Sequence, residues 1–94
     1  MKSFFDDYLA EQLKIPAVKA AFDEESKVLR VGMVLAKARK KKGLNQKQVA
    51  ALVGTSAPHL SRTERTPGHA NVRTLVRYAN AVGMELDFKL VAKR

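Results

Sequence analysis

The stretch NQKQVAALVGTSAPHLSRTER, residues 45–65, divides into two short segments on either side of Gly54. Asn45 suits a helix N-cap, and the apolar residues after it recur at helical spacing up to the glycine, which supplies the left-handed residue that ends many helices. Ser56 is a second N-cap, and Pro58 falls in the first turn of the next helix, where its missing N–H has no partner to lose. The stretch therefore predicts two helices joined by a tight turn.

Apolar residues at helical spacing predict helices before this stretch as well. Residues 3–13 are expected to form a short amphipathic helix with Ser3 as its candidate N-cap. Pro16 suits the first turn of a second helix. We expect Gly32 to mark where that helix ends or bends before another one, which runs to Gly43. The front of the chain is thus expected to be helical.

Near the end of the chain, the spacing of apolar residues changes from that of a helix to that of a strand. Asn71 is expected to cap a last helix, which Gly83 ends. Apolar residues then alternate with charged ones, in the two-residue repeat of a half-buried strand, at Met84, Leu86, Phe88 and Leu90. A lone strand leaves a row of unpaired backbone groups. We therefore expect it to pair with another chain, either a second copy in a homodimer or the sheet of a different protein.

Positive charge is concentrated in the later part of the chain. The net charge is +9, but residues 1–30 carry a net of −1 and residues 31–94 a net of +10. Such a basic body favours nucleic acid as a partner, with a membrane surface as the alternative. The chain has no cysteine, no apolar run long enough to cross a membrane and no signal pattern at its N-terminus, so we expect a cytoplasmic protein.

Catalysis and metal binding are not expected. The only histidines are His59 and His69, and no carboxylate lies at a ligand-like spacing from them. His59, Ser61 and Glu64 share one predicted helix, but side chains two residues apart point to different sides. They do not form a nucleophile and its base. We therefore expect no catalytic residue, no metal and no cofactor.

The order of residues from Val31 to about Leu86 resembles that of the Cro/phage-repressor-like helix-turn-helix family, often called Xre-type. This resemblance implies an all-α class: a five-helix repressor-like domain with an N-terminal helical extension and one C-terminal strand. Two residues depart from the family pattern, Thr63 in place of a large apolar residue and Thr66 in place of glycine. The matching residues are Gly43-Leu44, Gln46, Ala50, Gly54, Leu60-Ser61-Arg62, Glu64-Arg65, Thr74-Leu75 and Ala79-Ala81-Val82-Gly83.

The N-terminal part of the chain resembles one particular subgroup of this family. Its stretch DDYLAEQLKIPAVKAAFDEE is similar to the extension of HigA-like antitoxins, which repress their own operon and bind a ribosome-dependent RNase toxin. The resemblance implies a small basic, HigB-like toxin as a partner. A free-standing Xre-type regulator and an RNA-binding module are the alternatives. Against RNA, the basic body has only Tyr78 and Phe88 for base stacking, and both are expected to point inward.

The expected partner is a double-stranded DNA operator, bound by a homodimer. In this family the second helix of the motif lies in the major groove. Small apolar residues at its start allow the duplex to approach, and Arg62 suits bidentate contact with guanine. The alternatives are that Arg62 pairs with Glu64 or braces the fold, and that His59 is simply exposed. The expected base-reading residues are Ala57, Pro58, His59, Ser61 and Arg62.

Phosphate contacts are expected around that helix. The resemblance assigns one to Gln46, and the loop before the last helix offers free N–H groups to an anion. Asn71 is a helix cap as well. The expected phosphate-binding residues are Gln46, Lys47, Arg65, His69 and Asn71.

The chain accordingly divides into an extension at residues 1–30, a DNA-binding domain at 31–83 and a tail at 84–94. Aromatic residues rimmed by acidic ones in the extension suit an interface with a basic toxin, or packing in a dimer. The alternative is that this stripe covers the protein's own small core. Its members are Phe4, Phe5, Tyr8 and Phe22.

Overall fold

A computed structural model of the protein describes residues 4–93, so the candidate N-cap Ser3 lies outside the described residues. The described part is helical and contains no strand, which confirms the all-α class. None of its helices is both long and apolar enough to cross a bilayer. The elements are α1 (Phe4–Gln12), α2 (Pro16–Lys41), α3 (Gln46–Val53), α4 (Ala57–Arg65), the 3-10 turn η1 (Pro67–His69) and α5 (Val72–Ala81).

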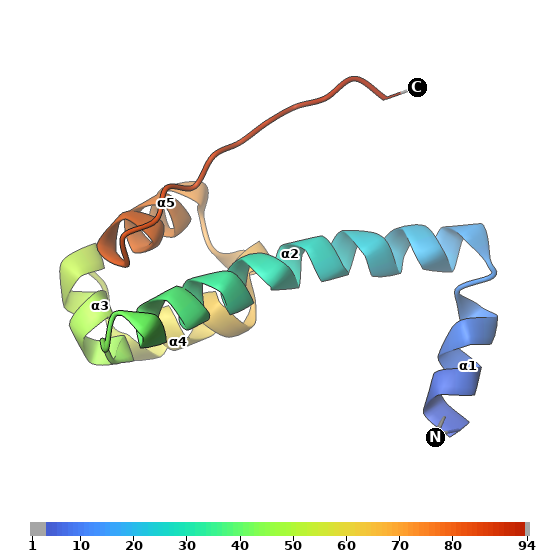
Figure 1. The fold of residues 1–94 in the computed structure, drawn as a ribbon, viewed down its shortest axis with the longest axis horizontal. Coiled ribbons are helices and arrows are strands. Elements are labelled where there is room, and N and C mark those ends of the chain that lie inside the picture. The colour runs from blue at the N-terminus through green and yellow to red at the C-terminus, as the bar shows by residue number, and fades with distance from the viewer. Residues whose placement is uncertain (1–3, 94) are drawn as a thin grey trace.

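The folded body surrounds the second half of α2. Helices α3, α4 and α5 gather there, whereas α1 and the first turns of α2 project away from them (Figure 1). Helix α1 contains no buried residue, so the aromatic stripe of the extension does not cover the core of a single chain. The buried apolar core is Leu35, Val49, Ala50, Val53, Leu60, Tyr78, Ala79 and Val82.

The two helices of the opening stretch form as their residues predict. The Asn45 side chain accepts a hydrogen bond from the Gln48 N–H at 2.7 Å, and the Gln48 side chain accepts one from the Asn45 N–H at 2.8 Å. Gly54 ends α3 with a φ of 84°, in the left-handed region that favours glycine. The Ser56 hydroxyl then accepts a hydrogen bond from the His59 N–H at 3.2 Å. Local capping therefore fixes both helix starts.

The expected break at Gly32 is wrong, because α2 runs unbroken past this residue. Gly32 is buried, and a Cβ placed on it would lie 2.1 Å from the carbonyl oxygen of Glu64 and 3.1 Å from the ring of Pro67. Glycine is needed there because α2 and α4 cross with their backbones nearly touching. The residue permits close helix packing and does not end a helix.

The strand expected from Met84 to Leu90 is also wrong for the single chain. The Met84 N–H donates to the Ala79 carbonyl at 2.8 Å, but residues 85–93 make no hydrogen bond within the described chain and run away from the body (Figure 1). Phe88, expected to point inward, is 61% exposed. Alternating residues favour an extended backbone, but a strand needs a neighbouring strand to bond to.

Replacing Gly32 by alanine should destabilise the protein. In an ordinary helix interior this change stabilises by about 1 kcal/mol. Here the added methyl would force α2 and α4 apart, so we expect the free energy of unfolding in urea to fall by about 1 to 3 kcal/mol. Met33→Ala, at an exposed neighbour in the same helix, is the control and should change it by less than about 1 kcal/mol. A Gly32→Ala protein as stable as the parent would contradict the close crossing.

Candidate nucleic-acid interface

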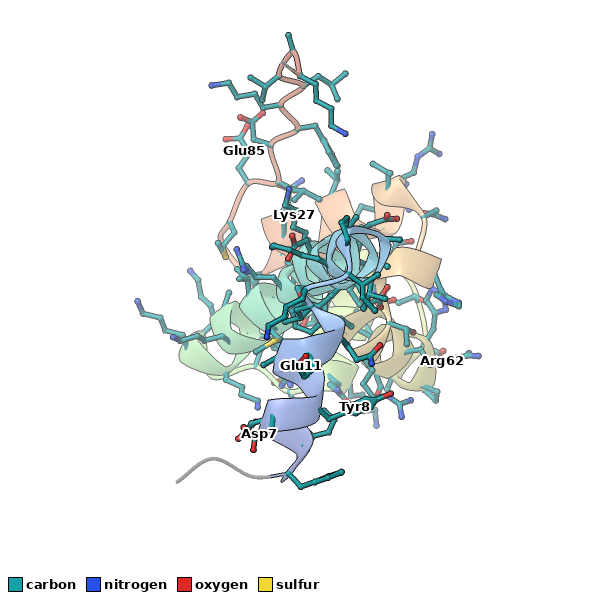
Figure 2. The ribbon with its side chains drawn as sticks, turned by 90° about the vertical axis from the view of Figure 1, so that its right-hand side faces the viewer. Asp7, Tyr8, Glu11, Lys27, Arg62 and Glu85 are labelled. Atoms are coloured by element: carbon teal, nitrogen blue, oxygen red, sulfur yellow. The ribbon has the colours of Figure 1, made fainter. Side chains whose placement is uncertain are left out.

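The predicted base-reading residues all keep exposed surface on α4. The opposite side of the helix packs into the body through Leu60 and Thr63, both buried. Figure 2 shows Arg62 pointing outward at the edge of the molecule, to one side of α1. Contact of these residues with bases stays a prediction. Their exposed side of α4 is not covered by the rest of the chain, so it is accessible to a duplex. Pro58 and Arg62 are exposed, and Ala57, His59 and Ser61 are partly exposed.

The two departures from the family pattern are accommodated within α4 and at its C-cap. The Thr63 hydroxyl donates to the His59 carbonyl at 3.0 Å, so this buried residue leaves no unpaired polar atom in the core. The Thr66 hydroxyl donates to the Arg62 carbonyl at 2.9 Å, and its φ of −132° is one that any residue adopts. Neither threonine distorts α4, the helix that carries the predicted base-reading residues.

A surface hollow brings residues from two predicted groups together. His59 and Arg62 of α4 line it with His69 of η1, although sequence reasoning gave His69 a phosphate role and the other two a base-reading role. Thr66 and Ala70 complete the wall between them. The three side chains therefore face a common space next to the exposed side of α4, where one bound group could contact all of them.

The other predicted phosphate ligands surround α4. Lys47 lies in the first turn of α3 and Arg65 at the end of α4, and both are exposed. Asn71 is confirmed as a cap, because its side chain accepts a hydrogen bond from the Thr74 N–H at 2.8 Å at the start of α5. The first N–H groups of α3 and α5 have no partner within their own helices. These positions can present positive charge and N–H donors to a polyanion.

A buried polar cluster lies beneath α4, centred on Glu64. Arg39 of α2 donates from Nε to Glu64 Oε2 at 2.9 Å, and its Nη1 donates to the Leu44 carbonyl at 3.0 Å. Gln46 of α3 donates from Nε2 to Glu64 Oε1 at 3.1 Å. The Tyr78 hydroxyl of α5 donates to Glu64 Oε2. Four helices thus meet at one carboxylate, which we call the Glu64 cluster.

Two predictions are affected by the Glu64 cluster. Glu64 pairs with Arg39, so the alternative in which it pairs with Arg62 is wrong. Gln46 uses its side-chain amide on Glu64 and is half-buried, so its predicted phosphate contact would have to come from its remaining groups. Sequence reasoning missed Arg39 because it stands in a run of lysines. Its place four residues after buried Leu35 puts it on the apolar stripe of α2.

The protonation of the cluster follows from its burial and its bonds. Burial raises the pKa of Glu64, but hydrogen bonds from Tyr78, Arg39 and Gln46 outweigh it, so the pKa lies below its ordinary value. Burial lowers the pKa of Arg39, but the Glu64 carboxylate more than offsets this and the net change is upward. Burial and then Glu64 raise the pKa of Tyr78. Glu64 is therefore ionised and Arg39 charged near neutral pH.

The comparison with known families agrees with this geometry. A family described as helix-turn-helix matches residues 35–89, which spans more than half of the chain. The protein belongs to this helix-turn-helix family, of the Xre/Cro type, whose members are DNA-binding transcriptional regulators. No curated protein and no solved structure matches the chain. Within residues 4–93, no three histidine or carboxylate side chains are grouped so that they could hold a metal ion.

Replacing Glu64 by glutamine should cost about 3 to 5 kcal/mol of unfolding free energy at pH 7, because Arg39 would remain buried without its counter-charge. The lowered pKa of Glu64 also sets a pH dependence. Its contribution is complete above the unfolded-state pKa, about 4.3, and is lost as pH falls through the lower folded-state value. We expect Glu64→Gln to lack this acid-dependent loss in urea titrations from neutral to acidic pH.

Glu24→Gln, at an exposed carboxylate of α2, provides the control for the charge change and should alter stability by less than about 1 kcal/mol. If Glu64→Gln is as stable as the control, or loses stability in acid just as the parent does, then the Glu64 cluster does not support the fold in the way described.

Proposed function

We propose that the protein is a sequence-specific repressor that binds double-stranded DNA as a homodimer, with α4 in the major groove. The outward face of α4 is the observation that carries this proposal, because its only long charged side chains are the exposed Arg62 and Arg65. Ala57 and Pro58 at the start of the helix are small and apolar, which lets the backbone approach base edges and thymine methyl groups. Arg62, one turn later, reaches guanine O6 and N7.

Phosphate contacts would hold α4 in register. Lys47, Arg65, His69 and Asn71 come from four different elements or their caps and are all exposed. Contacts of this kind position a protein on the duplex, whereas base contacts give its specificity. The body is also strongly basic, since residues 26–93 carry fourteen Lys/Arg and three Asp/Glu. This charge favours fast association with DNA of any sequence before the operator is read.

Two copies would read a palindrome. A single helix contacts only a few base pairs, and dimers of this kind place their recognition helices on half-sites about 34 Å apart. We assign dimerisation to the tail, whose apolar residues Met84, Phe88 and Leu90 are exposed in the single chain. With its backbone unbonded after Met84, the tail is available to pair with another chain.

Replacing Arg62 by alanine should weaken operator binding by about 1 to 3 kcal/mol and relax the preference at one base position. Random DNA should be affected much less, because the lost contact is to a base. Arg77→Ala removes an exposed arginine of α5, outside the proposed interface, and is the matched control. The operator is first selected from random duplexes, and affinities are then compared at one salt concentration. Equal losses on operator and random DNA would remove Arg62 from the base-reading set.

We further propose that the protein is the antitoxin of a toxin–antitoxin operon and that its N-terminal arm, residues 4–25, neutralises a small basic RNase toxin. The exposed aromatics of the arm support a protein partner: Phe4 is 88%, Phe5 66% and Tyr8 56% exposed. The arm carries six Asp/Glu and two Lys/Arg. An apolar surface with an acidic rim attracts a basic protein and repels nucleic acid. Figure 2 shows Asp7, Tyr8 and Glu11 on the free helix α1.

The double change of Phe5 and Tyr8 to alanine should abolish co-purification of the toxin, which is the small basic protein encoded by the adjoining reading frame. Aromatic anchors dominate such interfaces. Because both side chains are exposed, the melting temperature and operator affinity should stay close to those of the parent. Leu52→Ala, at an exposed apolar residue of α3 outside the arm, is the control. A sharp drop in melting temperature would instead indicate that these aromatics support the fold.

Two other outcomes would favour a free-standing regulator. One is the absence of any adjoining frame for a small basic protein, and the other is a full-affinity complex between the toxin and a chain that begins at Ser26. An RNA-binding module is less well supported, because Tyr78 is buried and Phe88 is the one exposed aromatic residue among residues 26–93. A single aromatic does not form a stacking platform for successive bases.

A further inference from the structure

An apolar groove lies between α2 and α5 where the tail leaves the body. Val31, Val34 and Leu35 of α2 form one wall and Ala79 of α5 contributes to the other. Lys27 and Arg30 also line it, together with the first residues of the tail. In Figure 2, Lys27 lies below Glu85 on the side of the body from which the tail rises. The groove is thus an apolar strip with cationic side chains at its edge.

The rest of the tail leaves this groove unfilled. Leu90 is fully exposed and Phe88 largely so, and the chain beyond Leu86 runs away from the body in both views (Figures 1 and 2). Val34 in the groove is itself 42% exposed. A single chain therefore carries an apolar groove and an apolar peptide that do not meet, and both are costly to leave in water.

We propose that the groove binds the tail of a second copy, with Phe88 and Leu90 of one protomer packed against Val31 and Val34 of its partner, and the reverse. Reciprocal exchange covers both grooves and both tails in one two-fold arrangement. The inference rests on the homodimer of the proposed function and adds the surface that forms it. Each tail binds a groove between two helices of the partner. Pairing of the two tails with each other would instead leave both grooves open to water.

Charge favours the tail over other occupants. The α2 wall of the groove carries two cations, Lys27 and Arg30, and no acidic residue. The first half of the tail carries Glu85 and Asp87, the only acidic residues after Glu64, whereas its lysines, Lys89 and Lys93, come later. Opposite charges at the rim fix the direction in which a peptide lies. The acidic helix α1 of the same chain is directed to the other side of α2, away from the groove (Figure 2). The tail is therefore the occupant that matches in both polarity and position.

Disulfide trapping tests this arrangement directly, because the chain has no cysteine of its own. Full-length Val34→Cys and Leu90→Cys proteins are mixed in equal amounts and oxidised gently. We expect a disulfide-linked dimer of the two different chains, formed at least about tenfold faster than when Val34→Cys is mixed with Val91→Cys, because docking raises the effective concentration of the facing pair. Val91 is also exposed, but its side chain points to the opposite side of an extended backbone.

Sedimentation provides a second measurement. Leu90→Asp should weaken the dimer by at least about tenfold, whereas Val91→Asp, the matched control, should change its dissociation constant less than about threefold. Since Leu90 is fully exposed in the single chain, neither variant should lower the melting temperature of the monomer. Equal effects of the two variants would overturn the proposed contact of Leu90 with the groove of the partner.

Other results would each point to a different arrangement. Leu90→Cys linking mainly to itself indicates pairing of two tails, which overturns the groove while leaving a homodimer. A Val34→Cys/Leu90→Cys chain that closes within itself at high dilution indicates that the tail folds back onto its own groove. A protein that stays monomeric at all concentrations overturns the exchange and the homodimer together. Operator selectivity through Arg62 is measured separately and does not depend on any of these results.

Discussion

The Glu64 carboxylate holds helix α4 in place. Its bonds come from Arg39 of α2, Gln46 of α3 and Tyr78 of α5, so one side chain of α4 is tied to the three helices around it. A buried ion pair contributes little net stability compared with apolar packing, but it tolerates only one geometry because every partner must be satisfied. The cluster therefore fixes the orientation of α4, and with it the direction in which Arg62 points.

The backbone of the same residue sets the distance between helices. The Glu64 carbonyl lies where a side chain on residue 32 of α2 would be, so only glycine allows this crossing. The carboxylate and the carbonyl of Glu64 thus constrain α4 in two ways, in orientation and in depth. With both fixed, the small residues Ala57 and Pro58 start the helix at a defined height above the core, as close contact with a base edge requires.

Features that depend on neighbouring residues were predictable from the sequence, and those that depend on distant ones were not. The caps at Asn45, Ser56 and Asn71 were predicted because a cap bonds to a residue three positions away. The role of Gly32 was predicted wrongly, because glycine is needed there for the close approach of α4, which lies far along the sequence. The strand failed for a similar cause, since alternation specifies an extended backbone but not the chain that pairs with it. The Arg39–Glu64 pair is an exception among the distant contacts: it could have been predicted, because Glu64 is the only acidic residue between 26 and 84.

The unbroken helix α2 also separates charge along the molecule. It spans 26 residues, or about 39 Å, with Asp23, Glu24 and Glu25 towards one end and Arg39, Lys40 and Lys41 at the other. Because the helix is continuous, these full charges form a permanent dipole opposite in sense to that of the peptide groups, whose smaller partial charges only partly offset it. Near a duplex such a dipole turns its negative end outward before any contact is made. The protein would therefore meet DNA already oriented, with the basic end of α2 leading and the arm directed into solution.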